Sequence, residues 1–307
     1  MWTSPRRGRG RGVAERVEVA APAKVNLRLC ILAREEGGYH ALETVFCALS
    51  LADTVVVTKG DAGIRLRVDG GVDTGPPEKN LAIRAAERFY RETGETAAID
   101  INLTKRTPSA AGLGGGSSDA AATLRALNAL HGDPLPRGAL LQMAIELGAD
   151  VPFFLCGSPL ALAWGRGERL MPLPPLPPRP VVVAHPGHAM PTADAFAEIA
   201  RRRGGAYRPT SAVIDPTALA NWASVALLAV NDFEPVVAER IPLVGSGLDA
   251  LRDAGASIAL LAGSGSSVFG IFQSVGEADS ALALVQAWGL RVWQAETLDE
   301  MPEPWVS

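Results

Sequence analysis

The stretch Pro108-Ser-Ala-Ala-Gly-Leu-Gly-Gly-Gly-Ser-Ser118 decides the fold prediction for this chain. Apolar and polar residues alternate before it, from Ile99 to Leu103, which predicts a strand. After it, Leu124 and Leu127 recur at helical spacing in an alanine-rich run. The predicted order is therefore strand, glycine loop, helix. Because a glycine loop that opens onto a helix N-terminus presents free N–H groups and the positive end of the helix dipole, we expect it to bind an anion, and phosphate is the simplest candidate.

Two common phosphate-binding loops do not match this stretch. A Walker A loop ends in Gly-Lys-Ser/Thr, and this loop contains no lysine. A dinucleotide fingerprint has a glycine at its sixth position, which counting from Gly112 is Ser117. A flexible loop that only turns the chain remains the alternative, although four glycines and two serines set against a helix start are an unfavourable way to make a turn.

The pattern Pro-x-x-x-Gly-Leu-Gly-Gly-Gly-Ser-Ser-Asp-Ala-Ala resembles the ATP loop of the GHMP kinases, a superfamily that includes galactokinase, homoserine kinase and mevalonate kinase. Its triple glycine and its tail most resemble the 4-diphosphocytidyl-2-C-methyl-D-erythritol kinases of the non-mevalonate isoprenoid pathway. The resemblance implies an α+β fold of two domains, an N-terminal mixed-sheet domain with the ATP loop and a C-terminal ferredoxin-like domain, with the active site in the cleft between them. It also implies ATP as phosphoryl donor and Mg²⁺ bound mainly through ATP, with help from Ser117 or Ser118. The implied nucleotide-binding residues are Pro108, Ser109, Ala110, Ala111, Gly112, Leu113, Gly114, Gly115, Gly116, Ser117 and Ser118.

One residue of the loop departs from the family pattern. The family usually has a glycine two residues after the proline, where this chain has Ala110. If that position needs a positive φ, alanine costs roughly 1 kcal/mol there.

A possible site for substrate lies near the N-terminus, between Arg16 and Leu32. The alternation predicts two strand segments separated at Pro22, with Lys24, Asn26 and Arg28 on one face. From the residues alone, a solvated strand face remains an alternative. The resemblance of Pro-Ala-Lys-Val-Asn-Leu to the first family motif implies that Lys24 lies at the reacting centre and that Asn26 contacts substrate.

A single carboxylate stands among apolar residues at Asp150, directly after a helix that we expect to end at Gly148. An isolated buried charge is unfavourable, so Asp150 needs a partner or a function, and a turn or capping role remains the alternative. The family resemblance implies that Asp150 is the catalytic residue that orients and deprotonates the acceptor hydroxyl. Lys24 would keep it ionised and stabilise the transferring phosphoryl group. By contrast, we expect Asp119 to be stabilised by the helix dipole without a catalytic role.

The remaining motifs point to the acceptor substrate. Gly-Tyr39-His40 resembles the family's cytidine pocket, with Tyr39 stacked on the base and His40 hydrogen-bonded to it. Thr192 and Phe196 resemble a second wall, with Phe196 on the opposite face of the base; a helix cap and a core phenylalanine remain the structural alternatives. The turn Asn231–Glu234 and the second glycine loop, Gly263–Ser267, also resemble family motifs, and the loop is expected to close against the nucleotide phosphates.

The composition of the 307 residues indicates how the chain is divided into domains and which partners are expected. We expect a disordered basic tail over 1–15, an ATP-binding domain over 16–175 and a second domain over 176–307, because the proline-rich run Met171–Pro180 favours an extended connector. A net charge of −4 gives no support for a nucleic-acid partner, and no apolar run approaches the roughly 18 residues of a membrane span. Single cysteines without metal-ligand spacing indicate buried thiols in a reducing, cytoplasmic compartment, and we expect a monomer or weak homodimer.

The sequence thus predicts an enzyme, an ATP-dependent kinase for a small-molecule cytidyl diphosphate alcohol. The resemblance implies phosphorylation of the 2-hydroxyl of 4-diphosphocytidyl-2-C-methyl-D-erythritol. Two alternatives remain: another GHMP kinase, of the homoserine or mevalonate type, and a non-enzymatic nucleotide-binding protein. A scaffold would need neither Lys24 nor Asp150, which argues against the second alternative.

Overall fold

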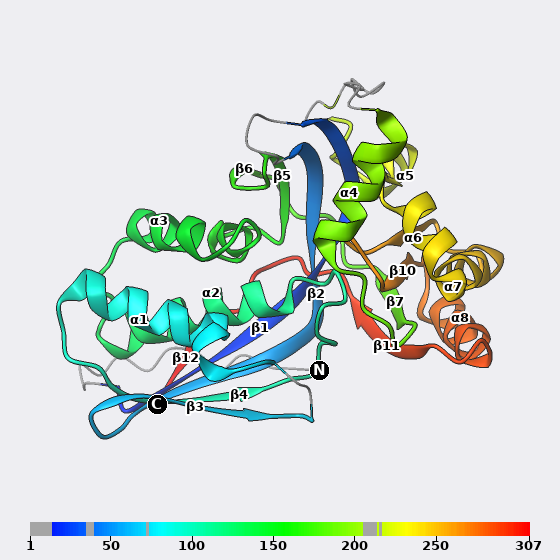
Figure 1. Cartoon of the computed structure of the whole chain (residues 1–307). Coiled ribbons are helices and arrows are strands. Elements are labelled where there is room, and N and C mark those ends of the chain that lie inside the picture. The colour runs from blue at the N-terminus through cyan, green and yellow to red at the C-terminus, as the bar shows by residue number, and fades with distance from the viewer. Residues whose placement is uncertain (1–13, 35–39, 72–73, 205–213, 215–216) are drawn as a thin grey trace.

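Two sheets organise the computed structural model, which describes residues 14–34, 40–71, 74–204, 214 and 217–307 (Figure 1). The larger sheet has eight strands in the order β12-β1-β2-β4-β3, with β5 and β6 continuing from β2 and with β8 beside β1. It is mixed, because β1 and β2 are antiparallel whereas β3 and β4 are parallel. The strands are β1 (Arg16–Arg34), β2 (His40–Lys59), β3 (Gly63–Asp69), β4 (Ala98–Thr104), β5 (Leu160–Gly165), β6 (Arg169–Pro172), β8 (Val230–Asn231) and β12 (Trp305–Val306).

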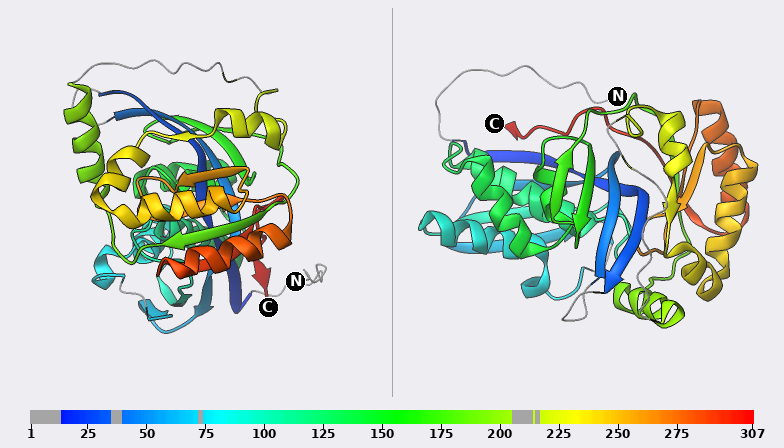
Figure 2. Two further views of the ribbon diagram at one scale, coloured as in Figure 1. Left: turned by 90° about the vertical axis from the view of Figure 1, so that its right-hand side faces the viewer. Right: turned by 90° about the horizontal axis from the view of Figure 1, so that it is seen from above.

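Strand β1 is continuous through Pro22, so the prediction of two separate segments is wrong. The pairing with β2 shifts register between Pro22 and Lys24, between Asn26 and Arg28, and again after Ile31. Proline lacks an N–H donor, and a strand tolerates it at a bulge, where the ladder is already interrupted. The strand therefore bends instead of ending, and the long β1–β2 ribbon runs between the two halves of the molecule (Figure 2).

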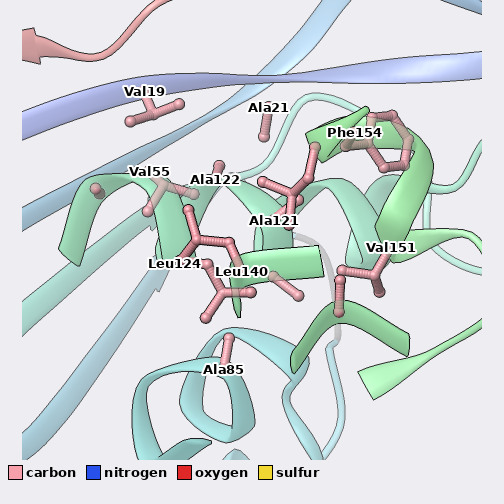
Figure 3. Close-up of a cluster of buried hydrophobic side chains, with 14 of the residues drawn as sticks. Val19, Ala21, Val55, Ala85, Ala121, Ala122, Leu124, Leu140, Val151 and Phe154 are labelled. Carbon is pink, nitrogen blue, oxygen red and sulfur yellow. The ribbon is translucent and has the colours of Figure 1, made fainter. Parts of the chain in front are cut away.

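Helices α1, α2 and α3 pack together beside the large sheet, with α2 directly on its strands, and local signals define their ends. Asn80 caps α1 (Leu81–Thr93) by accepting a hydrogen bond from Ala82 N, and Gly94 ends it with φ 71°. Gly148 ends α3 (Arg137–Leu147), which confirms the helix end predicted from the sequence. The central helix, α2 (Gly115–Leu130), lies against β1, β2 and α1. Figure 3 shows the resulting core, in which the small side chains of α2 lie beside sheet residues and next to the short 3₁₀ helix η2 (Val151–Leu155); its labelled members include Val19, Val55, Ala85, Ala121, Ala122, Leu124 and Phe154.

The second sheet has four antiparallel strands in the order β11-β7-β10-β9. Helices α7 and α8 pack on it, and this order of strands and helices is the ferredoxin-like arrangement. The expected α+β fold with a mixed-sheet half and a ferredoxin-like half is confirmed. The elements are β7 (Pro180–His185), α4 (Thr192–Arg203), α5 (Trp222–Leu228), α6 (Glu234–Arg240), α7 (Pro242–Asp253), β9 (Ile258–Leu261), β10 (Val268–Ile271), α8 (Val275–Ala287) and β11 (Arg291–Glu296).

The end of the chain returns to the large sheet, which the sequence did not predict. Val306 and Trp305 of β12 pair with Val17 and Glu18 of β1. A strand of two residues is too short to carry a recognisable alternation. No helix in the described ranges is long and apolar enough to span a membrane. Cys30, Cys47 and Cys156 are buried free thiols, as expected, and burial raises the pKa of Cys47 to about 12.

Candidate active site

The phosphate loop is held in a conformation that its glycines permit. Gly114, with φ 69°, is the N-cap of α2, so the helix begins inside the glycine run. A Cβ on Gly112 (φ 81°) would lie only 1.9 Å from the Ala262 carbonyl oxygen, which leaves room for no other residue. Ala110 has φ 52°. This loop position has a left-handed backbone, so the condition under which alanine is unfavourable is met at Ala110.

The second glycine loop, Gly263–Ser267, packs directly on the phosphate loop. Ser267 N donates to the Ala111 carbonyl at 3.2 Å. A Cβ on Gly263 would lie 2.8 Å from the Gly112 carbonyl oxygen and 3.2 Å from Lys24 Nζ. Strand β1 joins the same contact, because Lys24 N donates to the Leu113 carbonyl at 2.9 Å. Three segments far apart in sequence thus meet around the Lys24 ammonium group.

Lys24 is buried, with 4% of its surface exposed, so the alternative of a solvated strand face is wrong. Its ammonium donates to Asn26 Oδ1 at 2.9 Å, and Asn26 Nδ2 donates to Thr44 Oγ1 at 2.7 Å. Thr44 in turn donates to the Arg28 carbonyl at 2.6 Å. This chain of hydrogen bonds fixes the lysine side chain, and it brings Lys24 and Asn26 together as the sequence predicted.

Asp150 has the partner that its apolar neighbours require. It lies between Gly148 and η2, and its Oδ2 is 3.4 Å from Lys24 Nζ. The Asp150 side chain is 34% exposed whereas that of Lys24 is 4% exposed. The carboxylate can therefore meet a ligand that enters from solvent, while the ammonium behind it cannot move away.

Two cavities lie beside the phosphate loop, and the ion pair lines one of them. One of about 540 Å³ is lined by Lys24, Asn26 and Asp150 on one side and by Thr192 and Phe196 on the other. A second, of about 310 Å³, is lined by residues 108–117 of the phosphate loop together with Asn80, Lys105 and Asp119. Both volumes are in the range of small-molecule sites. Because Ala110, Gly112 and Gly114 line both cavities, a phosphate on the loop could be reached from either side.

The far wall of the larger cavity is helix α4. Phe196 packs edge-on against Phe233, with ring centroids 4.8 Å apart and planes at 87°. Thr192 is the first residue of α4, and its hydroxyl lies 2.8 Å from Ser264 Oγ instead of capping the helix. Tyr39 lies outside the described residues. His40 begins β2, but its side chain is also outside the described part, so both assignments stay predictions.

A buried charged cluster beneath the phosphate loop was missed by the sequence analysis. Lys105 Nζ donates to Asp119 Oδ2 at 2.7 Å and also to Asp53. Asp53, fully buried, accepts from the backbone N–H groups of Arg106 and Thr107 as well. Asp119 is 3% exposed instead of lying on the surface, and burial raises its pKa to about 7, with the Lys105 charge opposing and the Asp53 charge adding to the shift. An acid among small apolar residues at the helix start was the signal available.

The geometry agrees with what the chain is similar to. The model of the GHMP kinases N terminal domain matches residues 80–158, and that of the GHMP kinases C terminal matches residues 215–289. A 4-diphosphocytidyl-2-C-methyl-D-erythritol kinase from Geobacter sp. (strain M21) is 38% identical over 89% of this chain and 95% of its own length. The enzyme of that name from Paraburkholderia phytofirmans is 41% identical over 92% of this chain and 94% of its own.

The chain belongs to the 4-diphosphocytidyl-2-C-methyl-D-erythritol kinase family of the GHMP kinases. A crystal structure of a 4-(cytidine 5'-diphospho)-2C-methyl-D-erythritol kinase matches with a TM-score of 0.77 and 38% identity, over 91% of this chain and 98% of that one. A homoserine kinase from Cytophaga hutchinsonii, at 20% identity and a TM-score of 0.69, shares the fold. As a GHMP kinase the chain is an ATP-dependent small-molecule kinase, which excludes the non-enzymatic alternative.

Proposed function

We propose that this chain transfers the γ-phosphoryl group of ATP to the 2-hydroxyl of 4-diphosphocytidyl-2-C-methyl-D-erythritol. The observation that carries the proposal is the Lys24–Asp150 pair in the larger cavity, which shares the phosphate-loop residues Ala110, Gly112 and Gly114 with the second cavity. One cavity suits a nucleotide, since its wall is the glycine loop and the start of α2. The other suits an acceptor alcohol, since its wall combines aromatic and polar groups. Family membership favours the cytidyl alcohol over homoserine or mevalonate.

The nucleotide phosphates would be held by backbone N–H groups. The first amides of α2 have no acceptor inside the helix, and they follow directly on the loop residues Pro108–Gly114. Magnesium prefers oxygen ligands and is usually held by one or two carboxylates together with phosphate oxygens. Ser117, which lines the nucleotide cavity, and Asp150 are the oxygen donors that fit it. When bound, the ion would neutralise charge on the β- and γ-phosphates.

Transfer would occur beside Asp150. Its carboxylate would accept the proton of the acceptor hydroxyl as the hydroxyl oxygen forms a bond to the γ-phosphorus, while the bond to the β–γ bridging oxygen breaks and ADP leaves. Lys24 would stabilise negative charge on the transferring group, and its hydrogen bond to Asn26 would hold it in place. No side chain forms a covalent bond in this scheme. Positioning and charge neutralisation would supply the rate enhancement.

The acceptor would be recognised by the walls of the larger cavity. We assign the cytosine ring to a slot between Phe196 and Tyr39, with His40 at its hydrogen-bonding edge. Asn26 and Thr192 offer polar contacts within the cavity. We also place the boundary between the two domains at residues 175 and 176. The buried thiols support a reducing, cytoplasmic location, and we propose a monomer or weak homodimer.

The test is ADP release from MgATP with the cytidyl alcohol, homoserine and mevalonate as separate acceptors. We expect turnover with the cytidyl alcohol alone. In Asp150→Asn, which keeps the shape but cannot accept the proton, kcat should fall by about 10²–10⁴ while ATP still binds. Asp249→Asn, an exposed carboxylate on α7, is the matched control. Turnover with homoserine or mevalonate, or near-normal kcat in Asp150→Asn, would contradict the proposal.

A further inference from the structure

Residues Asn231–Glu234 form the end of β8 and the turn after it. They contact two walls of the acceptor cavity, helix α4 and the glycine loop Gly263–Ser267. We propose that Asp232 and Arg203 are positioning residues for the acceptor wall formed by α4, and that Asn231 is a positioning residue for the glycine loop Gly263–Ser267. The inference rests on the proposed function and assigns different kinetic roles to neighbouring residues of one turn.

Asp232 ties the C-terminal end of α4 to strand β1. Arg203, the last residue of α4, lies with Nη2 at 2.7 Å from Asp232 Oδ2 and donates from Nη1 to the Ile31 carbonyl. The same Asp232 oxygen accepts from Ile31 N at 2.7 Å, and Asp232 N donates to the Leu29 carbonyl at 3.0 Å. The side chains of Arg203 and Asp232 are 16% and 22% exposed, so water screens this pair less than a surface ion pair.

The other polar contacts of α4 are exposed: ion pairs of Arg202 and Asp194 with α6, and the Thr192 hydroxyl beside Ser264. Only Ala195 and Ile199 of this helix are buried. Phe196 rests edge-on against Phe233, the next residue of the turn, which is 1% exposed. The angle at which α4 presents Phe196 and Thr192 to the cavity therefore depends on the turn, through a charged contact at one end of the helix and an aromatic contact near its middle.

Asn231 holds the other wall. Its Nδ2 donates to the Leu261 carbonyl at 2.7 Å and to the Gly263 carbonyl at 2.8 Å, and its Oδ1 accepts from Phe233 N. It is 3% exposed. An amide supplies two donors and an acceptor in this arrangement, which neither a carboxylate nor an apolar side chain can replace. Because Gly263 lies against Lys24 Nζ, a shift of this loop would reach the reacting centre.

The two roles predict changes in different kinetic parameters. Helix α4 lines the acceptor cavity and not the nucleotide cavity, so loosening it should raise KM for the acceptor alone. Although the glycine loop also lines the acceptor cavity, it covers Lys24 and abuts the phosphate loop, so loosening it should lower kcat. A merely structural role would lower the apparent kcat in proportion to the folded enzyme lost and leave both KM values unchanged, so kcat is calculated per folded enzyme.

For the α4 contact, the variants are Arg203→Gln and Asp232→Asn. Each should raise KM for the cytidyl alcohol about tenfold, with KM for ATP changed less than about twofold. Arg203→Lys, which keeps the charge but not the two-pronged geometry, should restore part of the affinity. Arg202→Gln is the matched control, because Arg202 pairs with Glu198 and Glu239 and not with β1. An unchanged acceptor KM in both variants would overturn this half of the inference.

For the glycine loop, Asn231→Asp keeps the shape but replaces the two donated hydrogens with charge. It should lower kcat more than about tenfold with little change in KM for the acceptor. Asn221→Asp is the control, because Asn221 only accepts, from Ser224 N at the start of α5, and aspartate serves there equally. Equal effects on kcat in the two variants, or a fall in kcat explained by lost folded protein, would contradict the assignment.

Hydrogen exchange without any substrate separates this inference from the proposed function. Arg203→Gln should accelerate amide exchange in α4 relative to Arg202→Gln, with α1 as an internal reference. If wild type shows no turnover with the cytidyl alcohol, the proposed function fails, but faster exchange confined to α4 would still support the positioning role. Equal exchange in the two variants would overturn it whatever the substrate.

Discussion

Asp119 is the fifth residue of α2, past the first turn where we expected it, and its two carboxylate oxygens have different surroundings. One oxygen accepts from Lys105, while Oδ1 is buried and has no hydrogen-bond partner among the described residues. Burial, chiefly, raises the pKa of this carboxyl to about 7, because the charged form loses its hydration. Lys105 is already shared with Asp53, so it offsets only part of that loss.

The raised pKa of Asp119 gives a pH-dependent stability. The folded protein holds the proton more tightly than the unfolded chain, so this group's stabilisation is present at acidic pH and is lost as pH rises through about 7. In Asp119→Asn that loss should disappear, so the variant should gain stability relative to wild type between about pH 5 and about pH 8. Urea unfolding at about pH 5 and about pH 8 measures this stability difference, with the exposed Asp249→Asn as the control. Parallel pH dependence in Asp119→Asn and wild type would contradict the assignment.

At the scale of elements, the phosphate loop contains three positions with positive φ, and two of them, Ala110 and Gly112, should respond differently to substitution. Ala110→Gly relieves the left-handed alanine but gives the unfolded chain more entropy, so these effects of about 1 kcal/mol nearly cancel. Gly112→Ala instead forces a Cβ to within 1.9 Å of the Ala262 carbonyl oxygen. We expect Ala110→Gly to keep stability and KM for ATP, and Gly112→Ala to separate the two glycine loops and weaken ATP binding.

Thermal unfolding measures the stability of the two loop variants, and KM for ATP reports their nucleotide binding. Each variant serves as the control for the other. A large loss in Ala110→Gly would show that the alanine methyl group itself contributes a contact. Near-normal ATP binding in Gly112→Ala would mean that the two loops need not touch for the nucleotide to bind.

Local signals explain why several elements were predictable. Asn80 and Gly94 define α1 by their own capping chemistry, and the glycine run marks the start of α2. For the cluster of Asp53, Lys105 and Asp119, the acid among small apolar residues of α2 was a signal for Asp119 alone and did not identify its partners. Asp53 and Lys105 are 52 residues apart, so only the pairing of β2 with β4 brings them together. Asn26 and Thr44 meet for the same reason, through a register that bulges in β1 make hard to derive.

At the scale of the whole molecule, strand β1 connects the site to the end of the chain. Beyond Ile258–Leu261 and the other strands of the second sheet, the chain returns so that β12 pairs with Val17 and Glu18, upstream of Lys24 on the same strand. Figure 2 shows this return to the first sheet. The middle of β1 has other neighbours, since Lys24 pairs with Ala48 of β2 and donates to Leu113. Two separate sets of contacts therefore hold the start and the middle of β1.

Removal of Trp305 and the residues after it should thus lower stability without affecting catalysis. The deletion removes hydrogen bonds between Ser307 and Arg16 and the contact of the Arg16 guanidinium with the Trp305 ring, 5.5 Å from its centroid. Since Trp305 and Val306 are exposed by 37% and 51%, little apolar burial is lost, and we expect a loss of about 1–2 kcal/mol. Urea unfolding and kcat measure the two quantities, with Trp305→Ala to separate the ring from the strand pairing. Because Lys24 keeps its contacts with β2 and the phosphate loop, kcat measured well below the unfolding transition should match wild type, and a tenfold fall would show that β12 sets the position of the site.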